Sequence, residues 1–169
     1  MKQGQLSSAQ KKTAAAGGSL ALATAALLAI LPVWEGYSNK PYRDVVGVMT
    51  VCTGETRVRM RTYSDEECAK MLTRGVQPFL AAVLKRNPRI ESDPEQWAAH
   101  AALAYNIGEA AYSMSSAARL YAAGYEDAAC EAIGKFKYAG GKLWKGLVFR
   151  RYGDPKRYGE IELCREGLK

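Results

Sequence analysis

An uncharged apolar stretch covers residues 13–34 and reads TAAAGGSLALATAALLAILPVW. Because a bilayer-spanning helix needs about 20 residues, this stretch is long enough to cross a membrane. Thirteen of its 22 residues are Ala, Gly, Ser or Thr, and only eight are large and apolar. Each Leu or Ile favours insertion by only about 0.3 to 0.6 kcal/mol. We therefore predict a marginal, reversible membrane anchor. A cleaved export signal, a permanent anchor and a buried helix of a soluble domain are the alternatives.

The pattern changes directly after this stretch. Residues 35–55 are rich in Val, Tyr, Thr and Gly, which predicts short strands and tight turns, with one strand over 48–52. Helical patterning starts at Ser64, which forms a capping-box pattern with Glu67 and predicts a helix over 65–75.

Further helical segments follow, each bounded by Pro, Gly or Asn. Asp93 is expected to cap one of them, with Pro94 at the first helical position. We expect these helices at about residues 76–86, 94–108, 115–123, 125–136, from 143 onward, and 160–166. The pattern predicts an α+β fold with a small β-rich lobe and a larger helical lobe. We divide the chain into an N-terminal segment, residues 1–34, and one compact domain, residues 35–169.

The charge is basic, with 24 Lys and Arg against 17 Asp and Glu. Lys2, Lys11 and Lys12 precede the apolar stretch and no acid does, so the positive-inside rule puts the N-terminus in the cytoplasm. A net charge of +7 favours attraction to a polyanion, although a solvated surface explains it equally well. Nucleic acid is disfavoured as the partner, because no basic helix or aromatic-basic motif stands out and an exported domain would not meet it.

The cysteines are widely spaced and do not form a CxxC pair. With a single histidine, His100, the chain offers no zinc-ligand pattern, so no metal or other cofactor is expected. An even number of cysteines in an exported domain predicts two disulfides. Three pairings are open, and we favour the pairs of neighbours, Cys52–Cys68 and Cys130–Cys164.

Three residues just after the apolar stretch suit glycosidic hydrolysis. This reaction needs a proton donor on one side of the bond and, on the other, a carboxylate that activates water or stabilises positive charge. Glu35, between Trp34 and Gly36, could have the apolar setting that keeps a donor protonated. Asp44 would stay ionised in a polar turn, and the hydroxyl of Thr50 could orient water. Two acids and a threonine within 16 residues also occur by chance.

The wider pattern adds to this spacing. E-x8-D-x5-T within EGYSNKPYRDVVGVMTVCTGET, together with AALAYNIGEAAY and YAGGKLWKGLVFRR, resembles the phage-type lysozymes of glycoside hydrolase family 24. The resemblance runs from about residue 35 to 164, and the weak anchor resembles that of the signal-arrest-release (SAR) endolysins. The resemblance to the phage-type lysozymes implies a lysozyme-like fold in which Glu35 is the general acid and Asp44 and Thr50 hold the attacking water. Inversion would be expected, with carboxyl groups roughly 6.5–9.5 Å apart. Glu55 departs from the family pattern, which has a histidine there.

Several other residues have weaker assignments. Asn106 resembles a position near the cleft, where its amide could bind a sugar N-acetyl group, and a helix cap before Gly108 is the alternative. His100 is expected to be structural. Four basic residues are candidates for contact with the anionic wall or for a solvated face: Lys142, Lys145, Arg150 and Arg151. Trp97 and Trp144 are expected in the core, with stacking on a sugar ring as the alternative.

These features predict a muramidase that hydrolyses the β-1,4 bond between N-acetylmuramic acid and N-acetylglucosamine in peptidoglycan. Its partners would be glycan strands and, through residues 13–34, the host inner membrane, with the catalytic domain in the periplasm. Release as a monomer would then allow host lysis. Replacing Ala21, Ala23, Ala25 and Ala26 by Leu should strengthen the anchor and delay lysis. A lytic transglycosylase and a non-catalytic wall-binding module are the alternatives.

Overall fold

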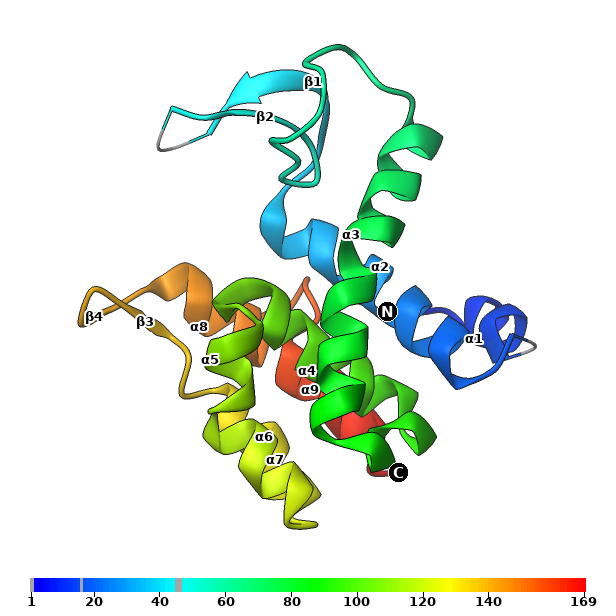
Figure 1. The fold of residues 1–169 in the computed structure, drawn as a ribbon, viewed down its shortest axis with the longest axis vertical. Coiled ribbons are helices and arrows are strands. Elements are labelled where there is room, and N and C mark those ends of the chain that lie inside the picture. The colour runs from blue at the N-terminus through cyan, green and yellow to red at the C-terminus, as the bar shows by residue number, and fades with distance from the viewer. Residues whose placement is uncertain (1, 16, 45–46) are drawn as a thin grey trace.

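The computed structural model describes residues 2–15, 17–44 and 47–169 (Figure 1). A small lobe carries the hairpin β1–β2, a larger lobe is helical, and the long helix α3 runs from one to the other. The predicted α+β architecture, with a small β-rich and a larger helical lobe, is confirmed. The elements in chain order are α1 (Ser8–Ala15), α2 (Ser19–Glu35), β1 (Ser38–Arg43), β2 (Met49–Cys52), α3 (Asp65–Arg86), η1 (Pro88–Ser92), α4 (Pro94–Ile107), α5 (Glu109–Ser113), α6 (Ser116–Ala122), α7 (Glu126–Ile133), β3 (Tyr138–Ala139), β4 (Lys142–Leu143), α8 (Lys145–Tyr152) and α9 (Glu160–Glu166).

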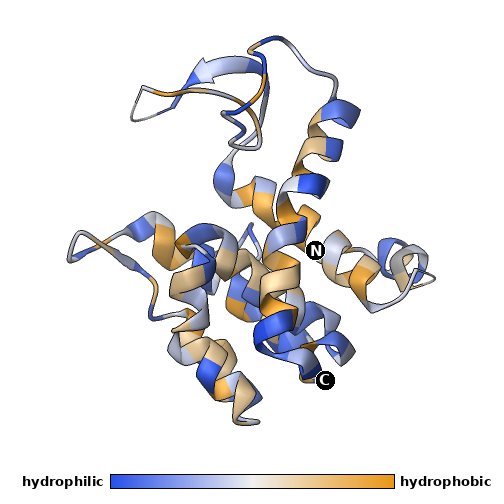
Figure 2. Cartoon of the chain, viewed as in Figure 1, coloured by the Kyte–Doolittle hydropathy of each residue, from blue (hydrophilic) through white to orange (hydrophobic). Residues whose placement is uncertain are grey.

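Helix α2 forms part of the core of the helical lobe. It packs against α3 and α4, and its apolar residues stand out along the ribbon in Figure 2. Leu27, Ile30 and Leu31 are at most 1% exposed. The apolar stretch is divided between α1 and α2, because Gly18 between them has φ +86°, where a glycine is favoured. Within the described residues, no helix is both long enough and apolar enough to span a membrane.

The N-terminal tip, residues 2–11, lies against the C-terminal part of the chain. Gln3 pairs with Arg157 in a parallel bridge: its backbone N–H donates to the carbonyl of Lys156 at 2.8 Å, and its carbonyl accepts from the N–H of Tyr158 at 2.9 Å. Leu6 packs on the core. The start of the chain is therefore part of the folded helical lobe.

Two ion pairs strengthen this contact. Lys2 pairs with Glu162, and the ammonium of Lys11 lies 2.9 Å from the carboxylate of Glu166. Both glutamates belong to α9, so the tip is fastened to the last helix of the chain.

Helix α3 corrects one prediction. The sequence predicts two helices, over 65–75 and 76–86, with Pro78 near the start of the second, but the structure has a single helix with Pro78 inside it. Its buried residues, Cys68, Leu72, Val76, Leu80 and Val83, recur at helical spacing along the whole length. Burial of this continuous apolar stripe outweighs the backbone hydrogen bond that the proline removes.

The predicted start of α3 is confirmed. The backbone N–H of Glu67 donates to the hydroxyl of Ser64 at 3.1 Å, and the N–H of Ser64 donates back to the Glu67 carboxylate at 2.8 Å. The predicted cap of α4 is only half right. Pro94 is its first residue, but the Asp93 side chain accepts from the hydroxyl of Tyr121 at 3.0 Å and does not cap the helix.

Shorter elements complete the helical lobe. The predicted helices over 115–123 and 125–136 correspond to α6 and to α7, which ends at Ile133. Gly140 and Gly141 turn the chain between β3 and β4, both with positive φ. The helix expected from residue 143 therefore starts only at Lys145, after this hairpin.

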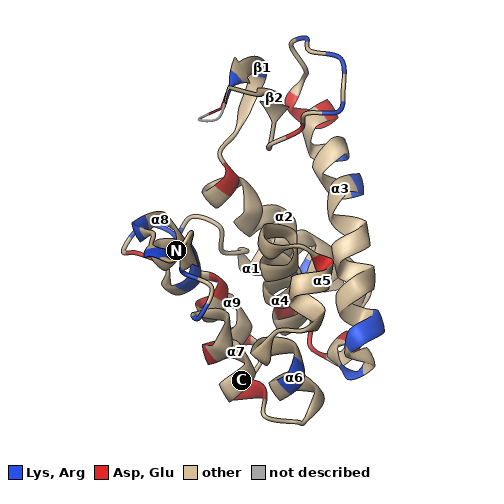
Figure 3. Cartoon of the chain, turned by 60° about the vertical axis from the view of Figure 1, so that its left-hand side comes forward, with Lys and Arg blue, Asp and Glu red and all other residues tan. Residues whose placement is uncertain are grey.

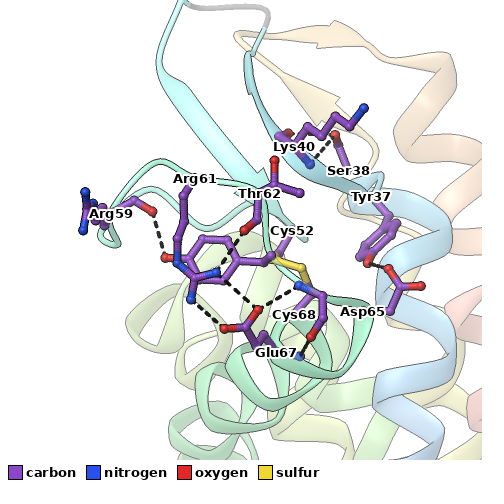
Figure 4. The surroundings of a disulfide bond; sticks show 12 residues. Tyr37, Ser38, Lys40, Cys52, Arg59, Arg61, Thr62, Asp65, Glu67 and Cys68 are labelled. Atoms are coloured by element: carbon purple, nitrogen blue, oxygen red, sulfur yellow. Dashed lines mark hydrogen bonds and ion pairs between the residues drawn. A yellow bond between two sulfur atoms is a disulfide. The ribbon is translucent and has the colours of Figure 1, made fainter.

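Two disulfides join neighbouring elements, and they are the two pairs favoured from the sequence. Cys52–Cys68 ties the end of β2 to the first turn of α3 (Figure 4). Next to it, Arg61 lies over the ring of Tyr63, 3.8 Å from its centroid. Cys130–Cys164 ties α7 to α9 inside the helical lobe. Each lobe thus has its own covalent link.

Candidate active site

Glu35 is the last residue of α2, where the two lobes meet. Gly36 ends the helix with φ +79°, a conformation that side-chain-bearing residues rarely adopt, and β1 starts at Ser38. This sharp exit leaves the Glu35 carboxylate 26% exposed at the base of the β-rich lobe. The position suits a group that must reach a substrate and still contact the core.

Asp44 and Thr50 lie on the hairpin β1–β2. Thr50 pairs with Tyr42, and the backbone N–H of Asp44 donates to the carbonyl of Val48 at 3.0 Å. Asp44 directly follows β1, and Thr50 lies in β2 two residues after Val48, so both residues belong to the same hairpin. Residues 45–46 lie outside the described residues.

Local hydrogen bonds fix both side chains. One Asp44 carboxylate oxygen accepts from the N–H of Val48 at 2.8 Å. Thr50 is only 3% exposed, and its hydroxyl donates to the carbonyl of Val48 at 3.1 Å. With its proton engaged, the Thr50 oxygen can still accept a hydrogen bond.

Arg150 holds Glu35 from the helical lobe. Its Nη1 lies 2.5 Å from the Glu35 carboxylate, and its Nε lies 2.7 Å from Glu160. Burial lowers the pKa of Arg150, but the charges of Glu160 and Glu35 more than compensate and raise it overall. The immediate partner of Glu35 is therefore a buried cation, not the apolar setting that the sequence suggested.

The arginine pair of α8 corrects another prediction. Arg150 is 4% exposed and Arg151 is fully buried, so neither can contact a polymer in solution. Their partner Glu160 is also fully buried, ten residues after Arg150 in the chain. The two arginines of the motif GLVFRR are therefore interior residues and not contacts for the cell wall.

Asn106 lies in the last turn of α4, exposed at its surface. Its amide oxygen accepts from Nη2 of Arg151, which links it to the charged residues around Glu35. The helix ends at Gly108, with φ +88°, and Asn106 is not its cap. Asn106 therefore stays a candidate for substrate contact.

Tyr105 and Glu55 lie on opposite sides of the lobe boundary. Both line a small pocket together with Cys52, Thr53, Met71, Leu72 and Gly75. The pKa of Tyr105 is raised, first by burial and then by the charges of Glu35 and Glu55. Glu35 and Glu55 are thus both close enough to Tyr105 for their charges to raise its pKa.

The other marked residues divide between core and surface. Trp97 is 1% exposed and donates to the carbonyl of Leu80 at 2.9 Å, so it is a core residue as predicted. Trp144 is 56% exposed, and its prediction as core is wrong. Its indole N–H bonds the carbonyl of Ala139 on the β3–β4 hairpin, which projects away from the core (Figure 1).

A β-rich lobe and a helical lobe, with a carboxyl group where they meet, define a lysozyme-like protein. The endolysin from Escherichia coli O157:H7 phage FAHEc1 has a similar fold, with a TM-score of 0.71 and 24% identity over 82% of this chain and 89% of that one. The active form of the P1 phage endolysin Lyz gives a TM-score of 0.69 at 21% identity, covering 87% of this chain and 85% of that one.

Sequence comparison identifies the family. The phage lysozyme family model matches residues 32–154, and the chain belongs to that family. The SAR-endolysin of Enterobacteria phage P21 is 39% identical over 154 residues, which cover 85% of this chain and 91% of that protein. This membership makes the chain a lysozyme-type glycosidase.

Proposed function

We propose that the protein is a muramidase that hydrolyses the β-1,4 bond between N-acetylmuramic acid and N-acetylglucosamine. The placement of Glu35 carries this proposal. Glu35 stands at the junction of the lobes, three residues before a hairpin that carries Asp44 and Thr50. A glycosidase needs this division between a proton donor and a group that handles water.

Each residue has a role that follows from its contacts. Glu35 protonates the leaving oxygen as the glycosidic bond breaks. Asp44 takes the proton of the attacking water, and Thr50 accepts that water's other hydrogen bond, because its own proton is already donated to Val48. Attack from the face opposite the leaving group would invert the anomeric carbon. This requires the two carboxyl groups to lie roughly 6.5–9.5 Å apart.

Product analysis on purified peptidoglycan tests the reaction. Glu35→Gln should lose activity by about 10² to 10⁴, the usual contribution of general acid catalysis. Glu109→Gln, an exposed carboxylate on α5, is the matched control and should clear normally. Unchanged clearing by Glu35→Gln would remove Glu35 from the mechanism.

Two further variants separate hydrolysis from lytic transglycosylation. Asp44→Asn and Thr50→Val should each lower activity if water is the nucleophile, and the products should carry a free reducing end. A transglycosylase needs neither residue, and its products would be anhydro sugars with the mass of one water less. Anhydro products would contradict the proposal.

The membrane state is the second part of the proposal. Residues 13–34 would anchor the chain in the host inner membrane, with the N-terminus in the cytoplasm and the catalytic domain in the periplasm. In the folded structure, residues 19–35 pack against α3 and α4. The same segment cannot lie in lipid and in this core at once. Its release into the periplasm would therefore complete the enzyme and allow lysis.

The β3–β4 hairpin supports a polyanionic glycan as substrate. Lys135, Lys142 and Lys145 are exposed. Within the part of the chain that the structure describes, no ion pair involves these three lysines or Lys137. Figure 3 marks the basic residues of α8, of which only Lys145 is exposed, because Arg150 and Arg151 are buried. Exposed Trp144 adds a flat surface on which a sugar ring can stack. The hairpin therefore suits contact with peptidoglycan beyond the cleaved bond.

A further inference from the structure

A chain of charged contacts runs beneath the proposed active site. We call it the Glu160 cluster and define it as Glu35, Arg150, Glu160, Arg151 and Asn106. One Glu160 oxygen lies 2.7 Å from Nε of Arg150, and the other pairs with Nη1 of Arg151. Each arginine then reaches a residue at the surface: Arg150 contacts Glu35, and Arg151 contacts Asn106.

We propose that Glu160 is a positioning residue of the active site: it holds one arginine on the general acid and the other on a substrate-binding amide. Glu160 is fully buried and cannot touch substrate itself. The inference rests on the proposed function in assigning Glu35 as the acid. It adds that one carboxylate of α9 controls two different steps, proton donation and substrate binding.

The guanidinium geometry supports this role. Arg150 is held at three points: by Glu160, by Glu35 at 2.5 Å and by the carbonyl of Ala102 at 3.3 Å. A guanidinium presents its donors in a rigid planar fork, so fixing one edge fixes the direction of the others. Without Glu160, the Nε edge of the Arg150 guanidinium would lose its carboxylate partner. Nη1 would then no longer be held in the direction of Glu35.

Arg151 is held in the same way. Its Nε donates to the carbonyl of Phe136 at 3.0 Å, while its two Nη atoms meet Glu160 and Asn106. Because a guanidinium has donors only, the Asn106 atom facing it must be the amide oxygen. The amide NH₂ then points elsewhere, has no partner among the described residues, and suits a carbonyl such as that of an N-acetyl group.

The charge balance gives the inference a signature in pH. Two carboxylates and two guanidinium groups leave the cluster neutral when all are ionised. Replacing Glu160 by glutamine leaves an excess positive charge beside Glu35, which favours the carboxylate over the protonated acid. The other ionisable groups near Glu35 are Tyr105 of α4 and, across the lobe boundary, Glu55. Neither changes in this variant.

The experiment compares the pH–rate profiles of the released full-length protein and Glu160→Gln on soluble peptidoglycan fragments. We expect kcat to fall at least tenfold, KM to rise, and the alkaline limb to move about one pH unit lower. Glu166→Gln is the matched control: it removes another ion-paired carboxylate of α9 outside the cluster. It should lower stability and leave the profile in place.

A merely structural Glu160 would give a lower melting temperature with an unchanged pH profile and KM, and this result would overturn the inference. Should Glu160→Gln not fold, Arg151→Lys provides the test. It keeps the charge but cannot contact Phe136, Glu160 and Asn106 together. We expect KM to rise with no shift of the alkaline limb, and an unchanged KM would contradict the inference.

Glu160→Asp is the conservative variant. It retains the charge on a shorter side chain, so it should keep the alkaline limb in place while kcat falls. A limb displaced as far as in Glu160→Gln would contradict the role of charge. The proposed function would fail on a different result, full activity of Glu35→Gln. No result with a Glu160 variant is equivalent to that outcome.

Discussion

Replacing alanines of α2 by leucine should distinguish its proposed insertion into lipid from its packing in the protein core. Ala21 and Ala25 are half-buried in the folded protein, whereas Ala23 and Ala26 are 0% and 4% exposed. Each of the four Ala→Leu substitutions favours membrane insertion by the same amount, because the change in side chain is the same. Only the second pair also overfills the core. The four alanines therefore provide a test and a matched comparison.

The structure allows the size of each effect to be worked out. Two additional leucines favour insertion by about 1 kcal/mol, which is roughly a fivefold change in the ratio of anchored to released protein. Ala21→Leu/Ala25→Leu should show this shift with little loss of folded stability. Ala23→Leu/Ala26→Leu should show the same gain in lipid and also destabilise the released protein by about 1 to 3 kcal/mol per site.

The assay measures membrane-bound and periplasmic protein in cells, in a Glu35→Gln background so that cells do not lyse. Thermal unfolding of the purified released proteins measures the stability of the folded state independently. If Ala21→Leu/Ala25→Leu partitions like the parent protein, the segment is not a marginal anchor and the reasoning fails. Equal unfolding curves for the two leucine pairs would refute the packing of α2 in the core.

Three further predictions concern the stability of the released fold. Burial lowers the pKa of His100 from 6.5 to about 4, so its neutral form is favoured on folding and stability should be lost as pH falls through this window, by roughly 3 kcal/mol in full. A His100→Gln variant that keeps the same acid sensitivity in urea titrations would disprove this source. Removing the Cys130–Cys164 link, which closes a 34-residue separation, should cost about 2 to 4 kcal/mol, and unchanged denaturant unfolding of the double serine variant would contradict it. Lys11→Glu should lower stability by about 1 kcal/mol at low salt by repelling Glu166, less at high salt, and a salt-independent result would exclude an electrostatic cause.

Local sequence signals predicted the second strand of the hairpin and several helix ends. The capping box at Ser64 depends on residues three apart, and the pairing of Tyr42 with Thr50 follows from one strand on each side of a tight turn. Such features need only nearby residues. This is why a turn at Asp44 and a strand at Thr50 could be expected, whereas their distance from Glu35 remains a prediction.

The charged interior could not be predicted in the same way. Arg150 and Glu35 are 115 residues apart, and Arg is rarely fully buried unless it is paired. Without knowledge of the pairing, solvent or wall contact was the natural assignment for Arg150 and Arg151. Trp144 shows the converse error, because a large aromatic residue is more often in the core than on an exposed hairpin.

The apolar segment posed a different difficulty. Lipid and protein core are both apolar surroundings, so the composition of residues 19–35 does not distinguish them. The small residues of α2 that weaken its preference for lipid also allow close packing, as at Ala23. One segment can thus meet both requirements, which is why a membrane anchor and a buried helix were both open from the sequence.

The most direct test of the account is the specific activity of membrane-embedded and released protein from the same cells, measured on the same soluble peptidoglycan fragments. Glu35 ends α2, the helix that in the proposed function leaves lipid before it packs against α3 and α4. We predict hydrolysis by the released protein and none above background by the embedded protein. Equal specific activity in both fractions would show that the site forms without release of α2, and would contradict the account.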